Sequence, residues 1–306
     1  MININILEKI KKDNKNIIGD DFVFETLNVG FTNDVFSINN KYILKICKDK
    51  ENESKFNNEI EFYLKNKNNK YLPRLLSFHK SVDINDASYL IIEKLTGKSL
   101  YYVWHTFNID KKKQIIKDLA EMMKSFHSIK GKSADWNIYI TDKIKKNLDI
   151  CHKENILNEQ YYIKGINILS KAEKYLTSTD FSLVHADIHF DNLIYTDEEQ
   201  LKIIDFETSI SAPIDYELDI FLRMCNKPLK YASEETEKFV KKEDYQDIEK
   251  WFKEYYPKIF SHQYYNIRMK YYDLEANIRL LPRFREDSEL KQIVVNIINE
   301  IEEINS

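Results

Sequence analysis

The pattern of hydrophobic and polar positions predicts a chain that begins with strands and continues mainly as helices. Up to about residue 95, short apolar runs indicate strands, and the run Tyr42–Cys47 is the clearest. Asn39 and Asn40 precede it and predict a hairpin turn, since asparagine tolerates the backbone angles of such turns. Residues 54–65 place apolar side chains at helical spacing. The other strands expected in this part are residues 22–24, 35–38 and 89–92.

Beyond residue 97 the pattern becomes mostly helical. Residues 110–130 form the clearest helical stripe, with Asp110 expected as the N-cap and Gly131 as the residue after the C-terminus. Two more helices are expected within residues 136–177, a β-rich segment at 181–206, and helices again from residue 215. This order predicts an α+β fold with two lobes. The smaller, β-rich lobe would span residues 1–95, and the larger, mostly helical lobe residues 96–306.

Composition narrows the class of protein. The 306 residues are 43% hydrophobic, which is enough to bury a core in two lobes. The 46 Lys and Arg against 50 Asp and Glu give a net charge of -4, which argues against a nucleic-acid-binding protein. Cys47, Cys151 and Cys225 lie far apart and predict neither a disulfide framework nor a zinc site. No window approaches the roughly 18 apolar residues of a membrane span. We expect a cytoplasmic protein with no membrane, nucleic-acid or obligate protein partner.

The β-rich segment contains the polar residues with the clearest chemical pattern. Asp187 follows an apolar strand, Asn192 follows in the loop, and Asp205 ends the apolar return strand. Phosphoryl transfer needs a carboxylate to orient the attacking hydroxyl and oxygen ligands to hold Mg²⁺. Taken alone, Asp187 is equally well explained as a turn or capping residue. The joint pattern of the three residues favours catalysis.

The same segment reads H-x-D-x-H-x-x-N from His185 onward and is followed by I-I-D-F. This pattern resembles the aminoglycoside phosphotransferase and choline kinase superfamily, which is related to the protein kinases. The resemblance implies a protein-kinase-like fold in which Asp187 is the catalytic carboxylate. Asn192 and Asp205 would be the Mg²⁺ ligands. His185 would support the loop, and His189 would contact the γ-phosphate or the acceptor.

The first 95 residues contain matching positions for a nucleotide site. Lys45 alternates with the apolar face of its strand and resembles the third-strand lysine that binds the α- and β-phosphates. Glu59 lies in the following helix and resembles the glutamate that forms an ion pair with this lysine. Glu53 and Glu61 are rivals for that role, although Glu61 points to a different helix face. For Lys45 itself, the alternative is an ordinary solvated lysine.

Two further segments are assigned by the resemblance. The turn that contains Gly30, Thr32 and Asn33 resembles the segment whose backbone N–H groups face the phosphates. A turn with a single glycine is, taken alone, more often an ordinary hairpin than a phosphate-binding turn. A hinge beside the adenine base is expected from its position at the end of the last strand. Its residues would be Ile92, Glu93 and Leu95.

The resemblance implies an enzyme that transfers the γ-phosphate of ATP or GTP to a hydroxyl of a small molecule, of the antibiotic-modifying aminoglycoside type. Between Asp205 and Pro213 there is no room for a long protein-kinase activation loop, so a small acceptor is favoured over a protein. A choline, ethanolamine or other metabolite kinase is the alternative within this fold. A nucleotide-binding pseudokinase that acts as an interaction module is the alternative from another class.

The acceptor site is the least determined part of the sequence. Residues 213–219 resemble the family segment that anchors the catalytic loop to the next helix, with Asp215 and Asp219 as its acids. Four carboxylates near the loop are candidates to meet a cationic acceptor: Glu207, Asp215, Glu217 and Asp219. The aromatic-rich stretch 251–272 is expected to be helical core, and an aromatic wall for a quaternary ammonium is the alternative.

Overall fold

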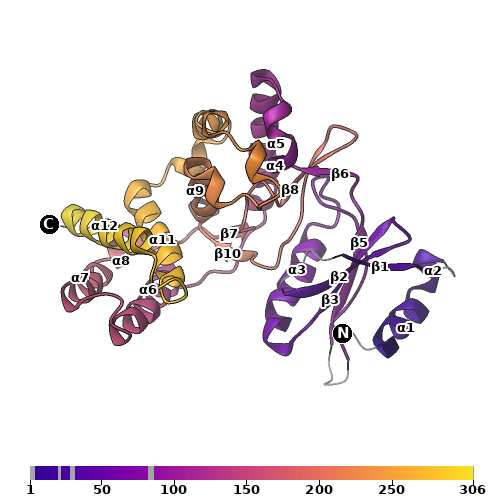
Figure 1. Cartoon of the computed structure of the whole chain (residues 1–306), viewed down its shortest axis with the longest axis horizontal. Coiled ribbons are helices and arrows are strands. Elements are labelled where there is room, and N and C mark those ends of the chain that lie inside the picture. Colours follow the sequence, from indigo (N-terminus) through magenta and orange to yellow (C-terminus); the bar gives the residue numbers. More distant parts are fainter. Residues whose placement is uncertain (1–3, 20–21, 28–31, 82–85, 306) are drawn as a thin grey trace.

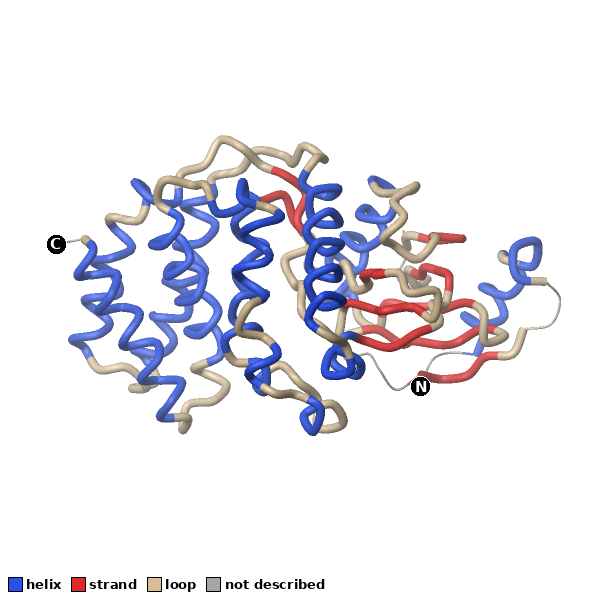
Figure 2. The backbone as a smooth tube through the Cα atoms, turned by 90° about the horizontal axis from the view of Figure 1, so that it is seen from above, coloured by secondary structure: helices blue, strands red, loops and turns tan. Residues whose placement is uncertain are grey.

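The computed structural model describes residues 4–19, 22–27, 32–81 and 86–305 and shows two lobes (Figures 1 and 2). The strand-rich lobe lies at the end of the molecule that holds the N-terminus. Helices fill the rest, and the C-terminus lies at the far end (Figure 1). The predicted α+β fold with a small β-rich lobe and a larger helical lobe is confirmed. Among the described helices, none has the length and apolar character needed to cross a membrane.

The small lobe is built on a five-stranded antiparallel sheet with the order β1-β2-β3-β5-β4. Its strands are β1 (Phe24–Leu27), β2 (Asn33–Ile38), β3 (Tyr42–Cys47), β4 (Leu75–His79) and β5 (Tyr89–Glu93). Asn39 and Asn40 connect β2 to β3 with positive φ angles of 51° and 54°, as the predicted hairpin requires. Strand β3 lies in the middle, and Lys45 is paired with Val35 on one side and Leu90 on the other.

Helices cover both faces of this sheet. The predicted helix is α3 (Glu53–Lys65), whose Phe56 and Ile60 share a core with Leu90 of β5. Two short N-terminal helices were not predicted, α1 (Ile4–Asp13) and α2 (Lys15–Ile18). Ile91 follows Leu90 in β5 and points to the opposite face of the sheet. There it packs with Ile10 of α1.

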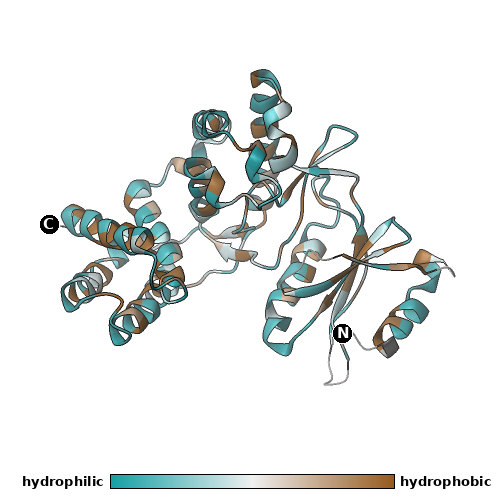
Figure 3. Ribbon diagram, in the orientation of Figure 1, coloured by the Kyte–Doolittle hydropathy of each residue, from teal (hydrophilic) through white to brown (hydrophobic). Residues whose placement is uncertain are grey.

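The large lobe consists mainly of helices. They are α4 (Leu100–Val103), α5 (Ile109–His127), α6 (Trp136–Lys153), α7 (Glu159–Ser170), α8 (Glu173–Leu176), α9 (Leu218–Asn226), α10 (Ile248–Tyr255), α11 (Tyr265–Leu280) and α12 (Ser288–Ile304). Figure 3 shows hydrophobic and hydrophilic residues mixed along these helices, as expected where one face of each is buried. Helices α6, α7, α11 and α12 pack around a second hydrophobic core.

Helix α5 differs from the prediction at both ends. Its N-cap is Asn108, whose side chain accepts a hydrogen bond from the backbone N–H of Lys111, and not Asp110. Both residue types cap helices well, and the helix begins two residues earlier than expected. At the other end the C-cap is Ser128. Gly131 lies instead in the connection from α5 to α6, where its backbone N–H donates to the carbonyl of Phe181 and a Cβ would lie 3.0 Å from the backbone of that residue.

Two small sheets position the β-rich segment of the large lobe. Strands β6 (Gly97–Ser99), β8 (Leu193–Thr196) and β9 (Leu201–Ile203) form one sheet, and β7 (Ser182–Val184) pairs with β10 (Ile210–Ala212). The loop from β7 to β8 carries residues 185–192, and the loop from β9 to β10 carries Asp205. Because β8 and β9 are paired, these two loops leave the sheets side by side.

The largest hydrophobic core runs through both lobes. Phe62 of α3 stacks on Phe206 with their ring centroids 4.2 Å apart, and it also contacts Phe126 of α5. Phe206 is fully buried and directly follows Asp205. A boundary between two lobes at residue 95 stays a prediction, because this core continues across it.

Candidate active site

The loop after β7 begins in a strained conformation that a buried carboxylate holds in place. Ala186 has a φ angle of +63°, which an L-residue with a Cβ rarely adopts. The backbone N–H groups of His185 and Ala186 donate to the two oxygens of Glu217, over 2.8 and 2.7 Å. Charge-assisted bonds of this kind are stronger than neutral ones and offset the strain. The backbone conformation at the start of the loop is therefore held by the carboxylate of Glu217.

Glu217 belongs to a buried polar network. Its side chain is fully buried, and its Oε2 lies 3.2 Å from Nε2 of His127. The other ring nitrogen of His127 lies 2.9 Å from the hydroxyl of Tyr256. Burial raises the pKa of Glu217, but the hydrogen bond and charge of His127 and the bonds to the loop outweigh it. The pKa is lowered overall, so this carboxylate is ionised in its buried position.

The anchoring segment works through a different residue from those expected. Asp215 is buried in a bidentate ion pair with Arg268 of α11, and Asp219 pairs with Arg223 on its own helix, α9. Glu217 instead bonds the loop. Sequence reasoning missed this role, because a carboxylate two positions from another in a helical segment gives no local signal of which one points to the loop.

Asp187, His189 and Asn192 form a compact group on the loop. The side-chain amide of Asn192 donates to the backbone carbonyl of Asp187 over 2.9 Å and lies 3.3 Å from its Oδ2. Nε2 of His189 lies 3.7 Å from the same carboxylate. Burial raises the pKa of Asp187, but the nearby His189 outweighs it and the pKa is lowered. The pKa of His189 is raised, because Asp187 outweighs the effect of burial.

Asp205 lies beside this group. The backbone N–H of Ile204 donates to the carbonyl of Asn192 over 3.0 Å, which joins the two loops one residue before Asp205. The carbonyl of Ile204 lies 3.1 Å from Nε2 of His185. His185, at the start of one loop, therefore also contacts the other and has the supporting position expected of it. Asp205 has a positive φ of 69°, and its side chain stays 38% exposed. The three polar residues of the sequence pattern are thus brought together.

The small lobe contributes an ion pair that reaches Asp205. Nζ of Lys45 lies 2.8 Å from Oε1 of Glu59 and 3.5 Å from Oδ1 of Asp205. Burial lowers the pKa of Lys45, but these two carboxylates outweigh it and the pKa is raised. Burial raises the pKa of Glu59, against the opposing charge of Lys45. The expected ion pair is present, and its role toward a nucleotide stays a prediction.

The two rivals of Glu59 have other partners. Glu61 forms an ion pair with Lys80 at the surface. Glu53 accepts a hydrogen bond from the hydroxyl of Ser88 over 3.3 Å. Of the three glutamates, Glu59 is the one that pairs with Lys45, and we call the region between Lys45 and the two loops of Asp187 and Asp205 the cleft.

The turn before β2 also touches the far side of the cleft. The hydroxyl of Thr32 donates to Oε2 of Glu207 over 2.8 Å, and the amide of Asn33 lies 3.4 Å from the same oxygen. Glu207 follows Asp205 by two residues, so this contact joins the small lobe to the loop that carries Asp205. Gly30, the third residue predicted for this turn, lies outside the described residues.

The predicted hinge residues lie where the chain leaves the sheet. Ile92 is buried, Glu93 ends β5, and Leu95 is half-buried in the connection to β6. The backbone N–H of Glu93 donates to the carbonyl of Arg74, and its carboxylate accepts the N–H of the same residue. The segment is thereby tied to the start of β4. Contact between this hinge and a base stays a prediction.

The donor set of the cleft fits Mg²⁺. The amide nitrogen of Asn192 is committed to Asp187, which leaves its oxygen as the atom for a ligand, and Asp205 supplies an exposed carboxylate. Mg²⁺ usually takes one or two protein oxygens and completes its shell with waters and phosphate oxygens. In the part of the chain that the structure describes, no group of three or more His, Cys, Asp and Glu could hold a metal ion.

The architecture is that of the protein-kinase-like fold, and the arrangement of these residues is the one expected of a phosphotransferase. A family model described as "Phosphotransferase enzyme family" matches residues 23–234, and the chain belongs to that family. No curated protein sequence matches the chain.

Solved structures share its fold along nearly its whole length. Aminoglycoside phosphotransferase APH(2'')-Ib with bound ADP is 20% identical, with a TM-score of 0.69 over 97% of this chain and 99% of that one. APH(2'')-IIa in complex with gentamicin is 19% identical, with a TM-score of 0.67 over 97% of each chain. A choline kinase from Cryptosporidium parvum is 15% identical, with a TM-score of 0.57 over 98% of this chain and 95% of that one.

Proposed function

We propose that the protein is a Mg²⁺-dependent kinase that transfers the γ-phosphate of ATP or GTP to a hydroxyl of a small molecule. One observation carries this proposal: Lys45 of the small lobe lies 3.5 Å from Asp205, in the loop bonded to the one that holds Asp187. A phosphate-binding cation, two oxygen ligands and a carboxylate therefore meet in one cleft. The family match and the nucleotide complexes among the structures of the same fold support it.

The chain's residues divide the work of transfer among them. Lys45, held by Glu59, positions the α- and β-phosphates. Asn192 and Asp205 would hold Mg²⁺, which neutralises charge on the phosphate oxygens when it is bound. Asp187 accepts the hydrogen bond of the acceptor hydroxyl and orients its oxygen toward the γ-phosphate. With a lowered pKa it is ionised at neutral pH, which is the form that this role requires.

The class of acceptor is proposed from two opposing observations. Structures of the same fold in complex with gentamicin or streptomycin favour an aminoglycoside. The four carboxylates that the sequence offers for a polycation are, however, committed within the protein to Thr32, Arg268, the catalytic loop and Arg223. This commitment favours the alternative, an acceptor with fewer positive charges such as choline, ethanolamine or another metabolite.

A transfer screen decides between these acceptors. Purified protein is incubated with Mg²⁺ and ATP or GTP against aminoglycosides, choline, ethanolamine and sugars, and the phosphorylated product is identified by mass spectrometry. Asp187→Asn serves as the matched control. We expect at least one acceptor to be phosphorylated by the wild-type protein only. Tight nucleotide binding with no product anywhere in the panel would contradict the proposal and favour a pseudokinase.

A further inference from the structure

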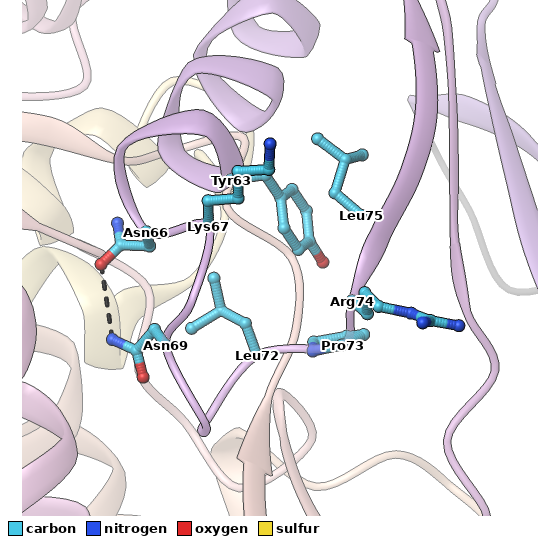
Figure 4. A pocket seen from close by; sticks show the side chains of 8 residues that line it. All are labelled: Tyr63, Asn66, Lys67, Asn69, Leu72, Pro73, Arg74 and Leu75. Carbon is cyan, nitrogen blue, oxygen red and sulfur yellow. Dashed lines mark hydrogen bonds between the residues drawn. The ribbon is translucent and has the colours of Figure 1, made fainter.

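A cavity of about 70 Å³ lies at the C-terminal end of helix α3 (Figure 4). It is formed by the end of α3, the connection to β4 and the first residue of β4, Leu75. None of its lining residues belongs to the predicted nucleotide or catalytic set. Leu72 and Pro73 are buried and form its apolar wall. The cavity is therefore a separate feature of the fold.

An unpaired donor lines this cavity. The side chain of Tyr63 is 2% exposed, and its hydroxyl has no hydrogen-bond partner. Figure 4 shows this hydroxyl directed toward Pro73 and Arg74 across the open space. A buried polar group without a partner is costly and rare in folded proteins, so it calls for a ligand. Burial and the nearby carboxylates of Glu59 and Asp205 raise the pKa of Tyr63, so the hydroxyl keeps its proton.

The two charged residues that line the cavity are cations, while the carboxylate of Glu93 accepts the backbone N–H of one of them, Arg74. Lys67 and Arg74 are exposed at its rim, and no carboxylate is among the lining residues. The side-chain amides of Asn66 and Asn69 are hydrogen-bonded to each other and form the polar part of the cavity wall. In Figure 4 the guanidinium of Arg74 extends away from Tyr63, and binding would require this exposed side chain to turn inward. The ammonium of Lys67 also lies away from the hydroxyl in Figure 4 and would have to turn in the same way. A hydroxyl donor in a small space with two mobile cations at its rim is suited to a compact oxyanion.

The cavity lies at a joint between the lobes. The amide of Asn69 donates to the hydroxyl of Ser125 on α5, and the backbone N–H of Ile203 donates to the carbonyl of Tyr71, each over 2.9 Å. Tyr63 lies one helical turn after Glu59, and Ile203 lies two residues before Asp205. A ligand here would contact the segments that lead into both sides of the cleft.

We propose that this cavity binds a compact tetrahedral oxyanion of the size of inorganic phosphate, through the Tyr63 hydroxyl and the side chains of Lys67 and Arg74. Phosphate also stabilises proteins generally by exclusion from their surface, and it can enter a nucleotide site. The effect of this one site is therefore isolated by comparing variants with one another at equal salt.

The test is a thermal-unfolding titration with sodium phosphate, against sodium chloride at matched ionic strength. It uses the wild-type protein, Tyr63→Phe, Arg74→Gln and the control Lys65→Gln, an exposed cation of α3 that does not line the cavity. At about tenfold excess of phosphate over its Kd, we expect a specific rise in Tm on the order of 1–3 °C in the wild type and in Lys65→Gln.

In Tyr63→Phe and Arg74→Gln this phosphate-specific rise should be absent. Tyr63→Phe retains the ring and removes only the donor, so a loss of the rise there identifies the hydroxyl. An equal rise in all four proteins, or a loss in Lys65→Gln as well, would show only general anion effects and overturn the proposal. The absence of a phosphate-specific rise in Tm in the wild type would also overturn the proposal. Water would then be the partner of the Tyr63 hydroxyl.

Discussion

The two sides of the cleft are held in place by different means. On the catalytic-loop side, the strained backbone at Ala186 is bonded to Glu217, which is fully buried and tied to His127. On the small-lobe side, Lys45 is held by an ion pair with Glu59 and approaches Asp205 only to 3.5 Å. The first arrangement consists of short buried bonds throughout. In the second, the pair of Lys45 and Glu59 is equally short and buried, and only the contact to the 38% exposed Asp205 is long.

This difference predicts separate tasks for the two sides of the cleft, transfer on one side and nucleotide binding on the other. The catalytic loop is shaped before any substrate binds, because moving it would leave buried N–H groups and a buried carboxylate unpaired. The small-lobe side can adjust, because its contact to Asp205 is long and the Asp205 carboxylate is partly exposed. We therefore expect changes on the loop side to affect transfer, and changes on the small-lobe side to affect nucleotide binding.

Removing the charge of Asp187 has the largest expected effect on the loop side. Asp187→Asn keeps the size of the side chain but cannot accept the hydroxyl proton, so kcat should fall about 10³-fold. Nucleotide affinity should change little, because Asp187 is not predicted to contact the nucleotide. Transfer assays with the best acceptor of the screen measure the first effect, and calorimetric titration with nucleotide measures the second. A kcat within tenfold of wild type would remove Asp187 from its role.

Glu217→Gln tests whether the buried anchor shapes the loop. Glutamine retains a single acceptor oxygen for the two N–H groups of His185 and Ala186, so one of them loses its partner. We expect kcat to fall about 10²-fold through misplacement of the loop. The free energy of unfolding should fall by about 1–3 kcal/mol in urea titrations. Glu303→Gln, an exposed position on α12, is the control, and equal behaviour of the two variants would contradict the account.

On the small-lobe side, Glu59→Gln should weaken nucleotide binding more than transfer. Lys45 would lose the charge that holds it in place, and we expect the nucleotide KM to rise about tenfold, with a smaller change in kcat. Glu61→Gln is the matched control on the same helix, since its partner Lys80 lies at the surface. If both variants raise KM equally, the ion pair with Lys45 is not what positions the nucleotide.

The smallest effect is expected at the contact between Thr32 and Glu207. Thr32→Val keeps the shape of the side chain and removes the hydrogen bond across the cleft. At a net value of about 1 kcal/mol for such a bond, nucleotide affinity should fall by about threefold to fivefold, as measured by calorimetry. Thr26→Val, at an exposed threonine of β1, should leave the affinity unchanged. An unchanged affinity in both variants would mean that this contact does not help to close the cleft.

Local patterns allowed much of the fold to be predicted. The alternation around β3 and the two asparagines before it gave strand and turn, because both signals lie within a few residues of each other. Strands β6 and β10 were missed, since each has three residues and exists only through pairing with a distant partner. The cap of α5 was misplaced because Asn108 and Asp110 are both good capping residues two positions apart.

The candidate site shows the same limit. Asp187, Asn192 and Asp205 lie within one short stretch of chain, so their spacing was readable. The function of Glu217 could not be predicted from spacing, because it depends on a backbone segment 31 residues away whose conformation is not evident from the sequence. The unpaired hydroxyl of Tyr63 is likewise invisible in a helical pattern, where the residue appears only as part of an apolar stripe.

The most direct test is the Mg²⁺ dependence of nucleotide binding, which requires no knowledge of the acceptor. Calorimetric titration of ATP and GTP, with and without Mg²⁺, compares the wild type with Asp205→Asn and Asp187→Asn. The account predicts that Mg²⁺ strengthens binding to the wild type and Asp187→Asn to a similar degree, and that Asp205→Asn loses this enhancement. The same enhancement in all three proteins would contradict the metal site on which the proposed transfer depends.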